Sequence, residues 1–402
     1  MRITRKLVRL LTAAALSLPL VAGVSTLSAS SAVAAPDLLP LNVTNNSNRG
    51  DQVYLYLLGT NLTTGRLGYV NSAGTFTPWS GGSNPPSPAP DVAINGPGGG
   101  GTTVLRVPRG MSGRVYMSFG QKLKFFLTPD GLVQPAPWAG GDANRDILFD
   151  WSEFTYDLGG SLFINSSQVD MFSVPHAVAV TGATGATQET GRLVSGGRDA
   201  VFNAVRDQPG DWSKLIYTRA DGTRLRVLAP GKGLDAGQFN ASYFDGYLNT
   251  VWDTYRNTTL TVVPFEAEPN KKFSGRTGTD NVLRFTDSTG ATVASFQKPA
   301  TRDVFGCDGK LQAPNDQVVG PIARTLCAAL HRSTLGYLHT QPTYSANDFY
   351  TRAISDHYSA KIHKNMVDGK AYGFAFDDVG HFESLVHDGN PSSARITLTP
   401  FQ

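Results

Sequence analysis

Two runs of β-branched and aromatic residues, separated by a pair of glycines, constrain the fold of this chain more than any other part of the sequence. They extend over residues 146–157 and 161–172, and the turn signal Asp157-Leu158-Gly159-Gly160 lies between them. This pattern predicts two antiparallel strands joined by a hairpin. Because strand side chains alternate between two faces, one face of the first strand carries Phe149, Trp151, Glu153 and Thr155. A tryptophan beside a glutamate suggests a sugar site.

The first 34 residues have the features of a secretory signal peptide. Four basic residues are followed by the apolar run 10–24 and then by the small residues Ala32-Val33-Ala34. The apolar run is too short to span a bilayer as a mature helix. We therefore predict a secreted, extracellular protein from which residues 1–34 are removed.

Removal of this leader changes the charge of the chain. The full sequence has 35 lysines and arginines against 32 acidic residues, and four of the basic residues lie in the leader, so the mature chain has 31 against 32 and a net charge of −1. Binding to nucleic acid or to an anionic membrane requires a clustered positive field. We therefore expect a neutral ligand, and neither nucleic acid nor a membrane as partner.

The hydrophobic periodicity changes along the chain. Short strand-like runs separated by glycine, proline and asparagine occupy residues 41–181, which is typical of a β-sandwich or β-barrel. Helical periodicity then predicts helices at residues 243–255, 319–330 and 347–366. Strand character returns after Gly369.

These changes predict a mainly β protein with two domains. We expect residues 35–195 and 371–402 to form a β-barrel or sandwich domain, and residues 196–370 to form a mixed α/β domain. We expect the chain to act as a monomer.

The two cysteines, Cys307 and Cys327, predict one disulfide in an exported chain. We expect this bridge to tie a loop to a helix. A free catalytic cysteine is the alternative, but neither cysteine has a flanking histidine signature.

The segment from Asp142 to Glu153 matches the spacing of a calcium-binding EF-hand loop at four positions. Ile147 stands at the sixth position, where that loop needs glycine for a sharp turn. We therefore predict no metal site and no cofactor, with a calcium-stabilised structural domain as an alternative.

The carboxylates of the central stretch are the remaining candidates for chemistry. Glycoside hydrolysis uses two carboxyl groups, one protonated and one ionised. Glu153 lies between Trp151 and Phe154, whose rings would exclude water from a general acid. Asp170 follows the polar run Asn165-Ser-Ser-Gln168, which suits a general base that stays ionised.

An idealised hairpin places these two carboxylates far apart. A two-residue turn at Gly159-Gly160 would pair Glu153 with Ser166, and Asp170 would then lie on the same face about 13 Å further on, at ~3.3 Å per residue. The carboxyl groups of inverting glycosidases lie roughly 6.5 to 9.5 Å apart, and those of retaining enzymes about 5 Å. A bulge, a strong twist or a third strand must therefore bring the pair together.

Three blocks of the sequence together resemble glycoside hydrolase family 64. They are Asp150-Trp-Ser-Glu-Phe-Thr-Tyr156, Ile164-Asn-Ser-Ser-Gln-Val-Asp-Met-Phe172 and Ala371-Tyr-Gly-Phe-Ala-Phe-Asp-Asp-Val379. Members of this family are secreted β-1,3-glucanases related to thaumatin-like proteins. The resemblance implies a β-barrel or sandwich domain, a mixed α/β domain and a wide groove between them. It also implies endo-acting, inverting hydrolysis of β-1,3-glucan to short oligosaccharides such as laminaripentaose.

The resemblance also implies roles for individual residues. Glu153 resembles the general acid of the family, and Asp170 resembles the general base that activates water. The family has asparagine and tryptophan at two contact positions where this chain has Asp157 and Phe163. With Trp151 as a stacking platform for a sugar ring, the expected substrate contacts are Trp151, Thr155, Asp157, Phe163 and Asn165.

A non-catalytic thaumatin-like protein that binds β-1,3-glucan or a cell wall in the same groove is the alternative function. A pure binder does not need two carboxylates at catalytic spacing. The separation of Glu153 and Asp170 therefore distinguishes the two hypotheses.

Overall fold

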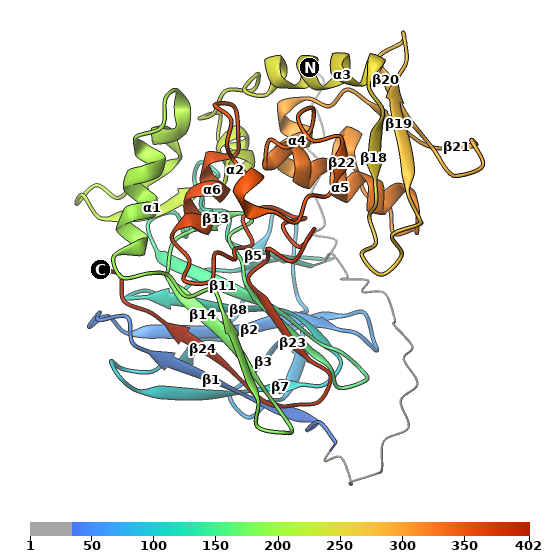
Figure 1. Ribbon diagram of the computed structural model, residues 1–402. Helices are drawn as coiled ribbons and strands as arrows, with labels where there is room; N and C mark the ends of the chain where they lie inside the picture. Colours follow the sequence, from blue (N-terminus) through green and yellow to red (C-terminus); the bar gives the residue numbers. More distant parts are fainter. Residues whose placement is uncertain (1–33, 130) are drawn as a thin grey trace. The chain divides into compact units, whose positions relative to one another are not determined.

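Two β-sheets pack face to face, and strands from both ends of the chain contribute to one of them (Figure 1). The computed structural model describes residues 34–129 and 131–402, so the expected leader lies outside the described residues except for Ala34. The first sheet has five strands in the order β15-β14-β24-β1-β7, with bounds Thr187–Thr190, His176–Gly182, Pro391–Leu398, Leu38–Asn45 and Thr102–Pro108. The strand β24 lies between β14 and β1, and its pairing with β1 is parallel.

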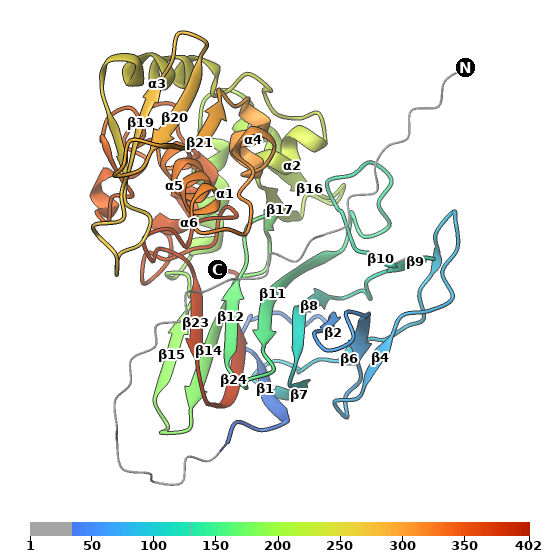
Figure 2. The same ribbon diagram turned by 90° about the vertical axis from the view of Figure 1, so that its right-hand side faces the viewer.

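The second sheet has eight strands and carries the predicted hairpin. Its path is β23-β12-β11-β8-β2-β3-β4, with bounds Leu385–Asp388, Leu162–Ser166, Leu148–Tyr156, Met111–Phe119, Val53–Asn61, Leu67–Val70 and Phe76–Pro78. A further short strand, β6 (Ile94–Asn95), pairs with β2. Figure 2 shows β23, β12, β11 and β8 side by side in this order.

The alternation of side chains along these strands produces two apolar cores. Val115 and Phe154 point toward the first sheet and pack in the core between the two sheets. Their neighbours Tyr116 and Trp151 point to the opposite face and join a second core, which also contains the buried faces of the helices. Glu153 shares the face of Trp151, because the two residues are two positions apart on β11. The second core therefore positions the candidate acid.

Three further sheets complete the β structure of the described residues. Their strands are β5 (Ser87–Pro88), β9 (Phe126–Thr128) and β10 (Gly131–Val133); β13 (Met171–Phe172), β16 (Ile216–Thr218) and β17 (Arg224–Leu228); and β18 (Leu260–Val262), β19 (Phe273–Thr277), β20 (Val282–Thr286), β21 (Thr292–Gln297) and β22 (Thr340–Gln341). The strand β13 belongs to the second arm of the predicted hairpin. The prediction of one continuous strand over residues 161–172 is therefore wrong, because the arm is divided between β12 and β13 in different sheets.

The described residues form six α-helices and three short 3-10 helices. The α-helices are α1 (Gly197–Arg206), α2 (Pro230–Asp235), α3 (Asp245–Asn257), α4 (Thr301–Gly306), α5 (Val319–His331) and α6 (His357–Lys364), and the 3-10 helices are Asp211–Leu215, Gly309–Leu311 and Ala346–Asp348. The helices predicted at 243–255 and 319–330 are confirmed as α3 and α5. The helix predicted at 347–366 is too long, since α6 begins only after Asp356, whose side chain accepts the N–H of Ser359 as an N-cap.

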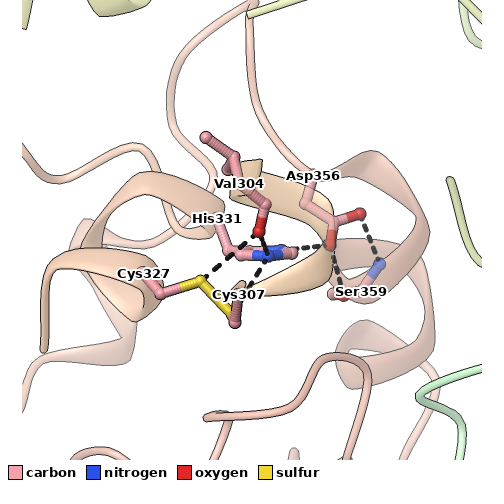
Figure 3. Close-up of a disulfide and its surroundings, with 6 residues drawn as sticks. All are labelled: Val304, Cys307, Cys327, His331, Asp356 and Ser359. Atoms are coloured by element: carbon pink, nitrogen blue, oxygen red, sulfur yellow. Dashed lines mark hydrogen bonds and ion pairs between the residues drawn. A yellow bond between two sulfur atoms is a disulfide. The ribbon is translucent and has the colours of Figure 1, made fainter. Parts of the chain in front are cut away.

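The cysteines form the predicted disulfide (Figure 3). Cys307 lies in the turn that directly follows α4, and Cys327 lies within α5, so the bridge ties a loop to a helix as predicted. Within residues 34–129 and 131–402, no helix is both long and apolar enough to cross a membrane. The mainly β class is confirmed, whereas the division into residues 35–195 plus 371–402 and residues 196–370 stays a prediction.

Candidate active site

The hairpin formed by β11 and β12 has a register that differs by one residue from the predicted one. Glu153 pairs with Asn165, not with the residue after it. The N–H of Asp157 donates to the carbonyl of Ser161 at 2.9 Å, so the loop contains three residues instead of two. Gly160 in this loop has a φ of +93°. Three-residue hairpin loops use such a left-handed residue, which glycine adopts without steric cost.

After β12 the chain leaves the sheet, and residues from the C-terminal part hold it there. The N–H of Gln168 donates to the carbonyl of Tyr372 at 2.9 Å, and Gln168 Oε1 accepts the N–H of Tyr372 at 3.0 Å. The hydroxyl of Tyr358 donates to the Gln168 carbonyl at 2.6 Å. The chain therefore bends where the idealised hairpin would continue straight, and Asp170 does not lie along the line of β12.

Arg114, on the strand β8 beside β11, brings the two candidate carboxylates together. Its Nη2 lies 2.9 Å from Oε1 of Glu153 and 3.9 Å from Oδ2 of Asp170. The Nε of Arg114 donates to the same Glu153 oxygen at 3.0 Å. The two carboxylate oxygens therefore lie within about 6.8 Å of each other, which is the sum of their distances to Nη2. This is about half of the separation expected for an idealised hairpin.

Trp151 supports Arg114 and does not face the solvent. The guanidinium carbon of Arg114 lies 4.7 Å from the centroid of the Trp151 ring, within the range of a cation–π interaction. The ring packs between Tyr116 and Phe149 and is 2% exposed. The expectation that Trp151 stacks on a sugar does not fit this buried position, because the apolar core and Arg114 cover the ring.

The surroundings of the two carboxylates differ in part from the expectation. Asp170 has a second cation beside it, since Nζ of Lys232 lies 3.0 Å from its Oδ1. The Asp170 side chain is only 14% exposed, but Arg114 and Lys232 give it the polar surroundings expected for a base. Glu153 is 35% exposed and paired with Arg114. The apolar surroundings expected for Glu153 are therefore wrong, because the Phe154 ring points to the opposite face of the sheet.

Arg114 and Lys232 are not among the predicted site residues. The sequence feature that could have indicated Arg114 is a basic residue within the strand Met111–Phe119. Lys232 had no such signal, because it lies in the short helix α2 and reaches Asp170 only through the tertiary fold. It also lies 4.5 Å from the centroid of the Trp138 ring, which positions its ammonium group.

Two of the expected substrate contacts lie in one row across four strands. Thr155 pairs with Ser112 on one side and with Phe163 on the other, and Phe163 pairs with His387. The hydroxyls of Ser112 and Thr155 are 2.8 Å apart. The rings of Phe163 and His387 stack with centroids 5.3 Å apart and an interplanar angle of 4°. The next row on this face consists of Arg114, Glu153 and Asn165.

The other two expected contacts are less available to a ligand. Asn165 is 5% exposed. Asp157 Oδ1 accepts the N–H of Ser161 at 2.8 Å, so this side chain closes the hairpin turn. The row of hydroxyl and aromatic side chains is thus the more accessible part of the predicted set.

The C-terminal part of the chain contributes acidic groups that act on Tyr372, as Glu153 also does. Among the described residues, Asp378 Oδ1 and Glu383 Oε2 are buried and have no hydrogen-bond partner. Burial raises the pKa of both carboxyls, to about 7 for Glu383, whose neighbour Asp378 also raises it. The pKa of Tyr372 is raised well above its usual value, first by burial and then by Asp378 and Glu153. Burial thus favours the neutral form of both carboxyls.

Asp150 lies buried on β11 and shapes the backbone that follows Asp170. Its Oδ1 accepts the N–H of Trp151 at 3.0 Å, and its Oδ2 accepts those of Ser173 and Val174 at 2.9 and 3.0 Å. Burial raises the pKa of this carboxyl to about 7, although the three N–H donors act in the opposite direction. Asp150 thus ties β11 to the segment that contains Asp170.

We expect Asp150→Ala to lower the free energy of unfolding by about 2 to 4 kcal/mol, because three buried N–H groups lose their acceptor. Since the folded pKa of about 7 lies above the unfolded value near 3.8, the contribution of Asp150 to stability is complete below the lower value and decreases as pH rises through the higher one. The substitution should therefore lower the free energy of unfolding more at pH 5 than at pH 8, as measured by urea unfolding. Asp146→Ala, which removes an exposed partner of Tyr217, is the control and should cost less than about 1 kcal/mol. Equal losses in both variants would contradict the role of Asp150.

Two carboxylates that share a cation on a partly exposed sheet face match the pair of carboxyl groups that glycoside hydrolases use. The sequence model of the β-1,3-glucanase family, glycoside hydrolase family 64, matches residues 37–398. The chain therefore belongs to glycoside hydrolase family 64, as the sequence resemblance predicted.

Similar proteins support this assignment. Two proteins named glucan endo-1,3-beta-glucosidase, from Arthrobacter sp. (strain YCWD3) and Cellulosimicrobium cellulans, are each 46% identical over 375 residues, which is 93% of this chain and 67% of the relative. The crystal structure of a laminaripentaose-producing β-1,3-glucanase in complex with laminaritetraose has 51% identity and a TM-score of 0.88, and the match covers 91% of this chain and 100% of that one. A β-1,3-glucanase domain from Clostridium beijerinckii has 25% identity and a TM-score of 0.76, with 90% and 98% covered.

Proposed function

We propose that this protein is a secreted endo-β-1,3-glucanase that hydrolyses linear β-1,3-glucan with inversion and releases short oligosaccharides of the laminaripentaose type. The observation that carries the proposal is the pair of carboxylates on Arg114, whose oxygens lie within about 6.8 Å of each other. Inverting pairs lie roughly 6.5 to 9.5 Å apart and retaining pairs about 5 to 5.5 Å, so the anomer of the product is the deciding observation. The family and the names of the similar proteins support the substrate and the endo mode of attack.

In the proposed reaction Glu153 is the general acid and Asp170 is the general base. Glu153 gives its proton to the glycosidic oxygen, and the bond from this oxygen to the anomeric carbon breaks. Asp170 takes a proton from water, whose oxygen attacks the anomeric carbon from the opposite side. The pair carries one negative charge before and after this step. Because Arg114 contacts both carboxylates, it can stabilise that charge on either of them.

The glucan is proposed to lie across the strands, in a groove of the thaumatin-like type above the second sheet. The hydroxyls of Ser112 and Thr155 offer hydrogen bonds to sugar hydroxyls, and the stacked rings of Phe163 and His387 offer an apolar face. The proposal also includes export by residues 1–34 and action of the mature chain outside the cell as a monomer. Without the four basic residues of the leader, 31 of the 35 lysines and arginines remain against 32 acidic residues, a net charge of −1. A neutral polysaccharide agrees with this small charge.

Product analysis on a linear β-1,3-glucan tests the proposal. The expected products are short oligosaccharides whose newly formed reducing ends are α-anomers at first. Proton NMR during the first minutes of the reaction identifies the anomer. If β-anomers form first, the reaction retains configuration and Asp170 is not a base that activates water. If the protein binds the glucan without cutting it, the non-catalytic glucan-binding alternative is correct.

We expect His387→Ala to raise KM for the glucan about 5- to 10-fold and to change kcat less than twofold. The reason is that the exposed His387 ring forms the outer part of the stack on Phe163, and an aromatic stack contributes about 0.5 to 1.5 kcal/mol. Initial rates over a range of glucan concentrations measure both constants. His381→Ala, which removes another exposed histidine, paired with Glu266 at 3.0 Å, is the matched control. An unchanged KM in His387→Ala would exclude this stack from the substrate path.

A further inference from the structure

The disulfide lies against a histidine whose surroundings are those of a metal ligand (Figure 3). Within the part of the chain that the structure describes, the sulfur atoms of Cys307 and Cys327 and a ring nitrogen of His331 lie within 4.8 Å of one another, and all three residues are buried. Cys327 and His331 are four residues apart on α5, so one helical turn places them on the same face. We propose that, when the disulfide is reduced, these three side chains bind Zn²⁺ or a similar thiophilic divalent cation.

The histidine is already oriented for this role. Its Nδ1 lies 2.7 Å from Oδ2 of Asp356. Asp356 is itself fixed by Ser359, whose hydroxyl donates to Oδ2 at 2.6 Å and whose N–H donates to Oδ1 at 3.1 Å. A carboxylate on the far nitrogen is the usual outer partner of a metal-bound histidine, because it fixes the ring and increases its basicity. The Nε2 atom consequently faces the disulfide, 3.8 Å from Cys307 Sγ.

A backbone oxygen lies beside the two sulfur atoms and the imidazole, and the spacing of zinc ligands decides which groups can bind the ion. The carbonyl oxygen of Val304 lies 2.8 Å from His331 Nε2 and 3.4 Å from Cys327 Sγ (Figure 3). Zinc prefers four ligands in a tetrahedron, with sulfur at about 2.3 Å and nitrogen at about 2.0 to 2.1 Å, so neighbouring ligand atoms lie roughly 3.5 to 3.8 Å apart. Two thiolates and the imidazole provide three ligands, and a water provides the fourth, because the Val304 oxygen lies closer to Nε2 than two ligands of one zinc ion do.

Replacement of the disulfide by a metal ion takes two steps. A dithiol gives two electrons and two protons to the bond between Cys307 and Cys327, and is itself oxidised to a disulfide. The metal ion then replaces the two thiol protons and the proton on His331 Nε2 that points to the Val304 oxygen. The disulfide and the metal are thus alternative cross-links between α4 and α5. The metal form belongs to the chain before its cysteines are oxidised.

A second histidine provides a matched comparison. His363 Nε2 lies 2.9 Å from Asp377 Oδ2, and its Nδ1 lies 2.8 Å from the carbonyl oxygen of Gly369. It therefore also combines a carboxylate with a backbone oxygen. Among the described residues, the group that could hold a metal contains His331 and not His363. His363→Ala should consequently leave metal binding unchanged.

The test uses the full-length protein, reduced with a dithiol that is then removed without oxygen, and titrated with Co²⁺. The expected result is one equivalent of Co²⁺ with thiolate charge-transfer absorption and tetrahedral visible bands, both lost when Zn²⁺ is added. The oxidised protein should show neither. Asp356→Asn should weaken binding 10- to 100-fold, and His331→Ala by at least about 100-fold, since losing a ligand costs more than losing its outer partner.

Circular dichroism separates a built site from thiolates in an unfolded chain. If the reduced protein is folded, or regains its folded spectrum when Co²⁺ is added, binding that depends on His331 supports the proposal. Absence of binding to the reduced protein overturns it. Equal affinity in the reduced wild type and in His331→Ala, or binding that does not restore a lost fold, also overturns it.

Discussion

Glu153→Gln should lower kcat on linear β-1,3-glucan at least about 1,000-fold while the affinity for the glucan stays within a few-fold. Glutamine has the shape of the acid and can accept a hydrogen bond from Arg114, but it has no proton to give to the leaving oxygen. General acid–base catalysis contributes about 10² to 10⁴ in rate, which sets the size of the effect. Initial rates of reducing-end release measure kcat, and retention on a glucan-containing gel measures affinity.

The role of each carboxylate can be separated by changing the leaving group. A β-1,3-linked oligosaccharide with a nitrophenol aglycone needs little protonation as the aglycone leaves, so Glu153→Gln should recover much of its rate on this substrate. Asp170→Asn should remain slow on both substrates, because the attacking water still needs a base. Glu189→Gln, at a carboxylate of the first sheet paired with Arg192 and Arg395, is the control and should change kcat less than twofold. If Glu153→Gln keeps more than a tenth of the wild-type rate on the glucan, Glu153 is not the acid.

Arg114→Met should lower kcat about 100-fold, which corresponds to ~2.7 kcal/mol of transition-state stabilisation. The substitution keeps an apolar stem over Trp151 but removes the cation that contacts both Glu153 and Asp170. The two carboxylates then face each other without a counter-charge, so the acid limb of the pH–rate profile should move to higher pH. Steady-state kinetics from pH 4 to pH 8 measures both effects.

Arg114→Lys serves as the conservative comparison. It should recover part of the rate, since it restores the charge, but not all of it, because an ammonium group cannot bridge two carboxylates as a planar guanidinium does. An increase in KM with kcat unchanged would show that Arg114 holds the substrate instead of the pair. Urea unfolding of both variants excludes a general loss of the fold as the cause.

The parts of the fold that were predictable are those that depend on local pattern. The hairpin was evident from its two β-rich arms, and α3 and α5 from their helical periodicity. The register was not predictable, because Gly159 and Gly160 suit a two-residue loop as well as a three-residue loop, and one additional residue shifts every cross-strand pair. The helix at residues 347–366 was overestimated, since an apolar period does not reveal that the α-helix begins only at His357.

The acidic residues of the candidate site could be predicted from the sequence, but its basic residues could not. Glu153 and Asp170 belong to one stretch of sequence, whereas the bend that brings them together depends on Tyr372, which is 204 residues from Gln168. No local pattern reports a contact of that range. For the same reason the Trp151 ring was expected to face a sugar, although Arg114 from the neighbouring strand covers it.

The position of β24 in the middle of the first sheet determines when that sheet can be completed. Leu41 on β1 pairs with Ala394 on β24, so the two partners lie 353 positions apart (394 − 41) in the sequence. Contacts of such sequence separation form slowly, because a long loop must close before they contribute. Until β24 inserts, β1 and β14 each present an unpaired edge that could pair with another chain. Completion of the first sheet therefore has to follow synthesis of β24, whatever the order in which the other sheets form.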